Sequence, residues 1–205
     1  MELQHTFLRL VNQHTGDSEL ANNLWIEVER SYSGKKRYYH TLAHLDHLLG
    51  QLLSVRDWIA NWDSVLFAVY YHDIIYDPLK KNNEEKSALL AEKRLRNLQI
   101  AKESIESCTK HILATSFHQA TEDSDTNLFT DADLSILGSD WNAYDTYRHH
   151  VRKEYSIYPE IIYNPGRRKV LQRFLQMKRI FKTDAFFYKY ENRAKLNLEK
   201  ELNEL

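Results

Sequence analysis

The sequence is poor in the residues that make turns and cross-links. Its 205 residues include only five glycines, three prolines and one cysteine. So few turn residues exclude a fold of many short strands, because each connection between strands calls for turn chemistry. The lone Cys108 excludes a framework of intrachain disulfide bonds and is typical of a protein from a reducing compartment.

Membrane segments, export signals and several common motifs are also missing. No apolar run approaches the roughly 18 residues of a membrane span, and the start, MELQHTFLRL, lacks the profile of a signal peptide. We therefore expect a cytoplasmic protein with no membrane partner. The sequence contains no GxGxxG, P-loop, HExxH, GxSxG or CxxC motif. Nucleotide binding through a glycine-rich loop is thereby disfavoured.

Apolar residues at helical spacing are present along nearly the whole chain. The clearest segments are 18–32, 40–55, 63–76, 83–98 and 104–118. Asp63 or Ser64 is the expected N-cap of the third segment. The NPG turn signal at 164–166 predicts two long helices after it, broken near Thr183. Because no repeat or linker interrupts the pattern, we predict one all-α domain over residues 1–205.

Histidine and aspartate stand out against this apolar background. His40, His44 and His47 are spaced i, i+4, i+7, which predicts one helix presenting all three on a stripe. His72 and Asp73 end an apolar run 32 residues after His40, an interval that suits an antiparallel return. An unpaired buried carboxylate is costly, so these two groups need partners at that depth.

Two further groups of the same kind follow. Asp131 and Asp133 lie among apolar neighbours in TDADLSILG, and His111, Thr115 and His118 repeat the i, i+4, i+7 stripe. Two imidazoles and two carboxylates suit a divalent transition ion such as Mn²⁺, Fe²⁺, Co²⁺, Ni²⁺ or Zn²⁺, with Mg²⁺ as a further candidate. The alternative for the His-Asp pair at 72–73 is a structural ion pair with an arginine such as Arg37.

Charge is unevenly placed although the formal net charge is only −1. Residues 1–147 hold 14 Lys and Arg against 22 Asp and Glu, whereas residues 148–205 hold 14 against 7. The basic part could face the acidic part and clamp a phosphate-bearing ligand; the alternative is a set of helices with solvated charges. A sequence pI of about 6.8 disfavours nonspecific nucleic-acid binding.

In combination, these pieces resemble a known family. The order of histidine, His-Asp pair and aspartate on helices resembles the HD superfamily of metal-dependent phosphohydrolases. The surrounding sequence is similar to a group of bacterial HD proteins of about this length. The similar segments are RYYHTLAHLDHLL, YYHDIIYDPLKKNNEEKSA, ILATSFH and DADLSILG, and later VRKEY, GRRKVLQRFL and ENRAKLNLEKEL. The resemblance thus covers most of residues 20–200. Lys195 departs from it, because an arginine is expected there. The resemblance implies an HD core over about residues 20–140 and basic C-terminal helices over about 141–205.

The resemblance also implies the ligands of the ion. These would be His40, His72, Asp73 and Asp133. Asp131 is the rival of Asp133, but the HD pattern takes the aspartate of the Ala-Asp pair. His40 and His44 are four residues apart, and we favour His40 as the ligand because it follows an aromatic pair. His44 would then lie beside the ion or face the phosphate.

Further roles follow for other matching residues. Those expected to take part in catalysis are Asp73, His44, Glu84 and His118, and those expected to clamp phosphate are Arg37, Lys81, Arg152 and Arg167. Glu84 could protonate the leaving group or orient water, or it could be a carboxylate favoured by the helix dipole. His118 could bind substrate, complete a second metal site or lie on the surface. Tyr39, Tyr76 and Tyr155 could stack on a base.

The expected function is hydrolysis of a phosphomonoester or phosphoanhydride by hydroxide on the ion, in a nucleotide-like small molecule. Two alternatives stay open. One is a diiron oxygenase of the HD type, which would need His44 and His118 as additional ligands. The other is a metal-containing module that senses a ligand without turnover. A homo-oligomer is compatible with each of these functions.

Overall fold

The computed structural model describes residues 2–205, and this part of the chain is helical with no strand. The predicted all-α fold is confirmed. The α-helices are α1 (Glu2–Asn12), α2 (Ser18–Tyr32), α3 (Leu42–Leu53), α4 (Trp62–Tyr71), α5 (Asn83–Asn97), α6 (Lys102–Ala114), α7 (Ser124–Leu134), α8 (Trp141–Glu154), α9 (Glu160–Gln176) and α10 (Asp184–Glu204), with 3₁₀ turns η1 (Arg56–Trp58) and η2 (Ser135–Gly138). Within the described range, no helix has the length and apolar character needed to cross a membrane.

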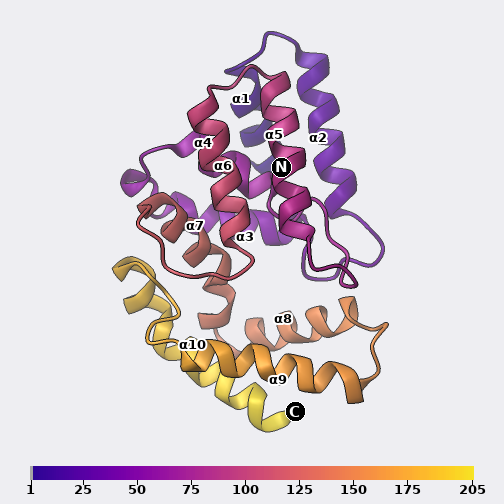
Figure 1. Cartoon of the computed structure of the whole chain (residues 1–205), viewed down its shortest axis with the longest axis vertical. Coiled ribbons are helices and arrows are strands. Elements are labelled where there is room, and N and C mark those ends of the chain that lie inside the picture. The colour runs from indigo at the N-terminus through magenta and orange to yellow at the C-terminus, as the bar shows by residue number, and fades with distance from the viewer. Residues whose placement is uncertain (1) are drawn as a thin grey trace.

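The helices form two groups in space. Helices α1 to α7 make up the upper part of Figure 1, and α8, α9 and α10 lie together below them. One apolar core runs through both groups and includes Phe7 in α1, Phe67 in α4 and Leu198 in α10. The apolar face of α1 packs on α2, α3 and α4, so residues before position 20 contribute to this apolar core.

Helix α4 is buried along almost its whole length. Asn61 caps its start by accepting a hydrogen bond from the backbone N–H of Ser64, so the predicted caps, Asp63 and Ser64, lie inside the helix instead. The helix ends at Tyr71, five residues earlier than predicted, and His72 is its C-cap. The His-Asp pair therefore lies where the chain leaves a buried helix, not within the helix.

The predicted stripe of three histidines on one helix is wrong at its first member. Helix α3 begins at Leu42 after an extended Thr41, so His44 and His47 lie on α3 whereas His40 lies in the turn before it. The physical reason is the backbone of Thr41, whose ψ of 179° is extended and interrupts a helix. The N–H groups of residues 38–40 donate to the carboxylate of Glu154 at 2.8 to 3.0 Å, which holds the turn before α3 in place.

The NPG segment at 164–166 is also not the predicted turn, because it lies within α9. The helix starts earlier, where the carbonyl of Pro159 accepts hydrogen bonds from the backbone N–H groups of Ile162 and Tyr163. Pro165 removes one helical hydrogen bond, whose acceptor belongs to Ile161, a residue that is 83% exposed and can be hydrated. The predicted break near Thr183 is confirmed, because α9 ends at Gln176 and Thr183 is the N-cap of α10.

Candidate metal centre

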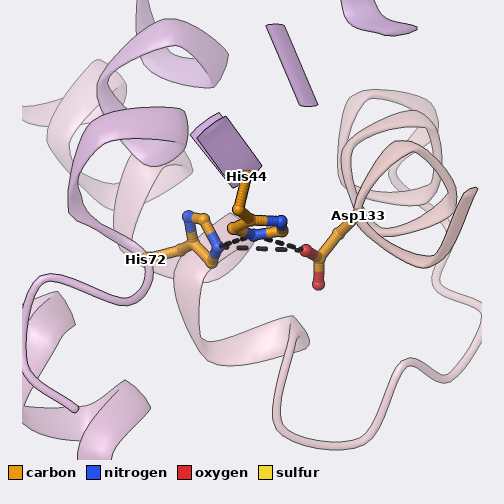
Figure 2. A group of neighbouring side chains, drawn as sticks. All are labelled: His44, His72 and Asp133. Carbon is orange, nitrogen blue, oxygen red and sulfur yellow. Dashed lines mark hydrogen bonds and ion pairs between the residues drawn. The ribbon is translucent and has the colours of Figure 1, made fainter. Parts of the chain in front are cut away.

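Three side chains from three helices converge in the interior. His44 comes from α3, His72 from the end of α4 and Asp133 from α7 (Figure 2). The two Nε2 atoms lie 3.1 Å apart, and Oδ1 of Asp133 lies 3.3 Å from Nε2 of His44 and 3.8 Å from Nε2 of His72. One ligand atom from each residue falls within 4.8 Å of the others, so the three could hold a metal ion.

Asp73 borders this cluster. Its Oδ2 atom lies 3.2 Å from Nε2 of His72 and 3.7 Å from Nε2 of His40. The structural pairing with Arg37 is not formed, because that guanidinium donates to the backbone oxygens of His40 and Ile74. Of the four expected ligands, the structure thus brings together His72, Asp73 and Asp133. The fourth, His40, lies next to Asp73.

Asp133 and Asp131 have separate surroundings. The carboxylate of Asp131 accepts hydrogen bonds from the backbone N–H groups of Lys182 and Thr183 and from the hydroxyl of Thr183. It therefore holds the chain at the start of α10. The structure places Asp133, the residue favoured by the sequence pattern, in the histidine cluster.

A backbone hydrogen bond fixes the orientation of the His72 ring. Its Nδ1 atom lies 3.0 Å from the carbonyl oxygen of Val69, so this nitrogen carries the proton and donates. Nε2 is then the atom that faces the cluster, as in metal-binding histidines whose other nitrogen is held by the protein. His44 is less constrained, because its buried Nδ1 has no hydrogen-bond partner in the described structure.

The electrostatics of the cluster separate its two histidines. Burial lowers the pKa of His44, which favours the neutral ring. Burial also opposes the charged form of His72, but Asp73 and Asp133 outweigh it and raise the pKa of His72 to about 9. Both aspartates keep a lowered pKa despite burial, because the surrounding histidines stabilise their charge. The cluster thus combines a neutral imidazole, an imidazolium and two carboxylates.

The donor set fits a divalent transition ion. Asp73 and Asp133 expose only 16% and 14% of their side chains, and across residues 2–205 neither has a lysine or arginine at ion-pair distance. Their charges are balanced only by histidines. A divalent ion accepts imidazole nitrogen and carboxylate oxygen together, and it would compensate the second carboxylate without a further cation from the chain.

His118 contacts the same cluster from outside any helix. Helix α6 ends at Ala114, so the predicted helical stripe through His111 and His118 is not formed. His118 adopts a left-handed backbone conformation with φ of 51°, which is uncommon for residues other than glycine. Its Nε2 atom lies 3.0 Å from Oδ2 of Asp133, on the carboxylate oxygen that does not face His44. His111 instead bonds the hydroxyl of Thr126 and lies away from the site.

Glu154 is a residue of this site that the sequence did not single out. Its Oε2 atom lies 2.7 Å from Nδ1 of His40 and accepts a hydrogen bond from the hydroxyl of Tyr76 at 2.9 Å. Burial raises the pKa of Glu154, but the bonds from His40 and from backbone N–H groups outweigh it and lower the pKa to about 2. The only available signal was VRKEY, in which a glutamate beside Lys and Arg resembles a surface residue.

A cavity of about 380 Å³ lies against the cluster. Among the residues singled out from the sequence, those that line it are His40, His72, Asp73, Lys81, Glu84, His118, Asp133 and Arg167, together with Tyr39, Tyr76 and Tyr155. Lys80 and Arg173 add two exposed cations to its wall. The cavity therefore brings carboxylates, imidazoles and cations together.

The arginines expected to clamp phosphate have other partners. Arg37 lies outside the cavity lining, with its guanidinium on two backbone oxygens. Arg152 also lies outside it and donates to the carbonyls of Tyr155 and Tyr158 at the end of α8. Arg167 reaches the wall, but its Nε and Nη2 atoms donate to the carboxylate of Glu201.

Comparison with known proteins finds no significant match to this chain. No protein-family model matches the chain, and no curated protein or solved structure shows a significant similarity to it. The functional conclusion must therefore be drawn from the site itself: a group of ligand atoms suited to a metal ion, at the wall of a cavity that also carries cations.

Proposed function

We propose that this chain is a metal-dependent hydrolase of the HD type, which cleaves a phosphomonoester or phosphoanhydride bond in a nucleotide-like small molecule. One observation carries the proposal. Two largely buried carboxylates, Asp73 and Asp133, face imidazole nitrogens at a cavity wall and have no lysine or arginine partner among residues 2–205. The imidazolium of His72 balances one of these charges, and a divalent ion would compensate the other.

The residues have separate tasks in this proposal. The ion would be held by His44, His72, Asp73 and Asp133. His40, whose Nε2 atom lies 3.7 Å from Oδ2 of Asp73, is a further candidate ligand. When bound, a divalent ion lowers the pKa of water and polarises phosphoryl oxygens. Lys80, Lys81 and Arg173 would bind the phosphate through their charges, since each lines the cavity and is exposed. Glu84 lines the same cavity and remains the candidate for protonating the leaving group or orienting water.

The proposal is tested by assays on the full chain after chelation and reloading. Samples carrying Mn²⁺, Co²⁺, Ni²⁺ or Mg²⁺ are offered a panel of nucleoside monophosphates and triphosphates, and released phosphate is measured. We expect turnover with at least one ion and its loss in Asp73→Asn. Asp46→Asn, an exposed change on α3, is the matched control and should keep wild-type activity. Metal binding without turnover on any member of the panel would instead favour a sensing module.

The second candidate is a diiron oxygenase, and the contact between His118 and Asp133 favours it. The two oxygens of Asp133 point to different histidines, since Oδ1 faces His44 and Oδ2 faces His118. A carboxylate between two such groups could bridge two ions. Loading with two equivalents of Fe²⁺ followed by exposure to air should then produce an iron-dependent optical absorption. A spectrum that does not change under these conditions would contradict this second candidate.

A further inference from the structure

A second cavity lies beside the metal cavity. It has a volume of about 370 Å³, and its walls come from the end of α8, the following loop, the first turns of α9 and Pro78 in the loop before α5. Four residues, Val151, Tyr155, Arg167 and Val170, line both cavities. A molecule with one end at the metal cluster could therefore extend into the second cavity without leaving the protein surface.

Three tyrosines lie in the wall of the second cavity, beside aliphatic residues. Tyr155, Tyr158 and Tyr163 line it, and each is only half-buried, so part of each side chain is accessible. The rings of Tyr155 and Tyr158 are stacked, with centroids 6.3 Å apart and planes at 28°. The ring of Tyr163 lies 6.0 Å from that of Tyr155 at an angle of 51°, and the guanidinium of Arg152 lies 4.6 Å from the centroid of the Tyr163 ring. Tyrosine rings in this arrangement suit a planar partner, because stacking on an aromatic face is favourable for any base.

The charge of the second cavity differs from that of the first. Its only charged lining residue is Arg167, which forms a two-pronged ion pair with Glu201 at 2.8 and 2.9 Å. Tyr144 donates a further hydrogen bond to the same glutamate. Because Arg167 is already neutralised and 9% exposed, it forms a fixed wall and not a phosphate site. The cavity is thus suited to the uncharged part of a ligand.

We propose that the second cavity is the subsite for a planar aromatic group of the substrate, a nucleobase, which stacks on the tyrosines while the phosphate lies at the metal cluster. The identity of the phosphate end rests on the proposed function. The base contacts the group formed by Tyr155, Tyr158 and Tyr163, with Val151 and Val170 as apolar walls. Recognition of the substrate is then shared between two cavities of different chemistry.

Gly166 allows this subsite to be blocked without strain. It lines the second cavity but not the first, and a Cβ atom built there meets no atom within 4 Å. Gly50 on α3 has the same free space and lies outside both cavities. Neither glycine has a positive φ, so a leucine fits the backbone at both positions. Gly166→Leu and Gly50→Leu are therefore a matched pair.

The experiment measures binding by calorimetry on the full chain as purified. The probes are phosphonate analogues of AMP and UMP, in which a methylene replaces the ester oxygen and prevents hydrolysis, the matching base-free analogue of ribose 5-phosphate, and hexylphosphonate. We expect wild type and Gly50→Leu to bind at least one base-containing probe about 10-fold more tightly than the base-free probe. Gly166→Leu should lose this preference. Tyr158→Ala removes a stacking ring without filling the cavity and should lose it too.

Three results would overturn the inference. The first is equal affinity of wild type for the base-containing and base-free probes. The second is an unchanged preference in both Gly166→Leu and Tyr158→Ala. The third is binding of hexylphosphonate as tight as that of the base-containing probes, which would show a general apolar pocket. Failure of the proposed function is distinguishable, because a base preference with no phosphate release from any nucleotide would contradict the hydrolase alone.

Discussion

Glu154 and His40 are joined by a contact of 2.7 Å between Oε2 and Nδ1, although they are 114 positions apart in the chain. The other oxygen of Glu154 accepts the backbone N–H groups of Tyr38, Tyr39 and His40. A single carboxylate at the end of α8 therefore fixes both the path of the chain before α3 and the ring of His40. Helix α8, the first of the C-terminal helices, thus contributes a residue that positions the site.

Glu154→Gln should destabilise the protein while leaving the fold intact. The amide oxygen can still accept the backbone N–H groups, but the charged partner of His40 is lost. We expect a decrease of about 1.5–3 kcal/mol in the free energy of unfolding, the range for a hydrogen bond to a charged group. Urea denaturation measures it. Glu160→Gln, an exposed change at the start of α9, is the control, and equal stability of the two variants would contradict the role given to Glu154.

The same carboxylate should make stability depend on pH in the acid range. The pKa of Glu154 is lowered from its ordinary value of 4.5 to about 2, so its contribution is present above about pH 4.5 and is lost as the pH falls through about 2. The contribution is about 3 kcal/mol. Wild type and Glu154→Gln should therefore differ most in unfolding free energy above pH 4.5 and converge near pH 2. A difference that stays constant over this range would contradict the assignment.

Metal binding should release a proton from His72. The two neighbouring aspartates outweigh burial and raise the pKa of His72 to about 9, and its Nδ1 proton is held by Val69. The proton that an ion must displace is therefore the one on Nε2. We expect the apparent affinity for Mn²⁺ to rise about tenfold per pH unit between about pH 6 and 8. Calorimetry in buffers of different ionisation enthalpy counts the protons, and no proton release at pH 7 would contradict this picture.

Gly138 in η2 lies close to the backbone of Tyr190 in α10. A Cβ atom at this position would lie 2.6 Å from both Cβ and the backbone oxygen of Tyr190, so even alanine forces the backbone of α10 to move. We expect Gly138→Ala to lower the free energy of unfolding by about 1–3 kcal/mol, as overpacking does. Gly50→Ala, in open space on α3, should instead be neutral or stabilising by up to about 1 kcal/mol. Thermal unfolding of both variants decides the point, and equal melting temperatures would contradict it.

The parts of this structure that follow from local pattern could be predicted from sequence. Apolar spacing indicates the helices, and ionisable residues beside apolar runs indicate that His72 and Asp133 lie inside. Asp133 and Asp131 could not be separated by spacing alone. Their difference arises from the N-terminus of α10, whose backbone N–H groups lie some 50 positions away and bind Asp131.

The parts that depend on distant contacts could not be predicted. The spacing of His40 and His44 suits one helix, but residues 38–40 form a turn whose N–H groups bind the distant Glu154, and α3 begins only after the extended Thr41. Nothing in VRKEY distinguishes that glutamate from a surface charge. The same holds for Arg167 on α9, whose partner Glu201 lies 34 positions later on the next helix, α10.

We propose that His44, His72 and Asp133 hold a divalent metal ion. The most direct test is the metal content of the chelated and reloaded chain, with His44→Gln and His47→Gln compared on the same helix. His47 bonds the hydroxyl of Ser135 and lies outside the ligand group, so it is the matched control. We predict about one equivalent of a first-row divalent ion in wild type and His47→Gln, and loss of the ion in a folded His44→Gln. A wild-type chain that rebinds no ion at micromolar metal, or a His44→Gln variant that binds as wild type does, would contradict the account.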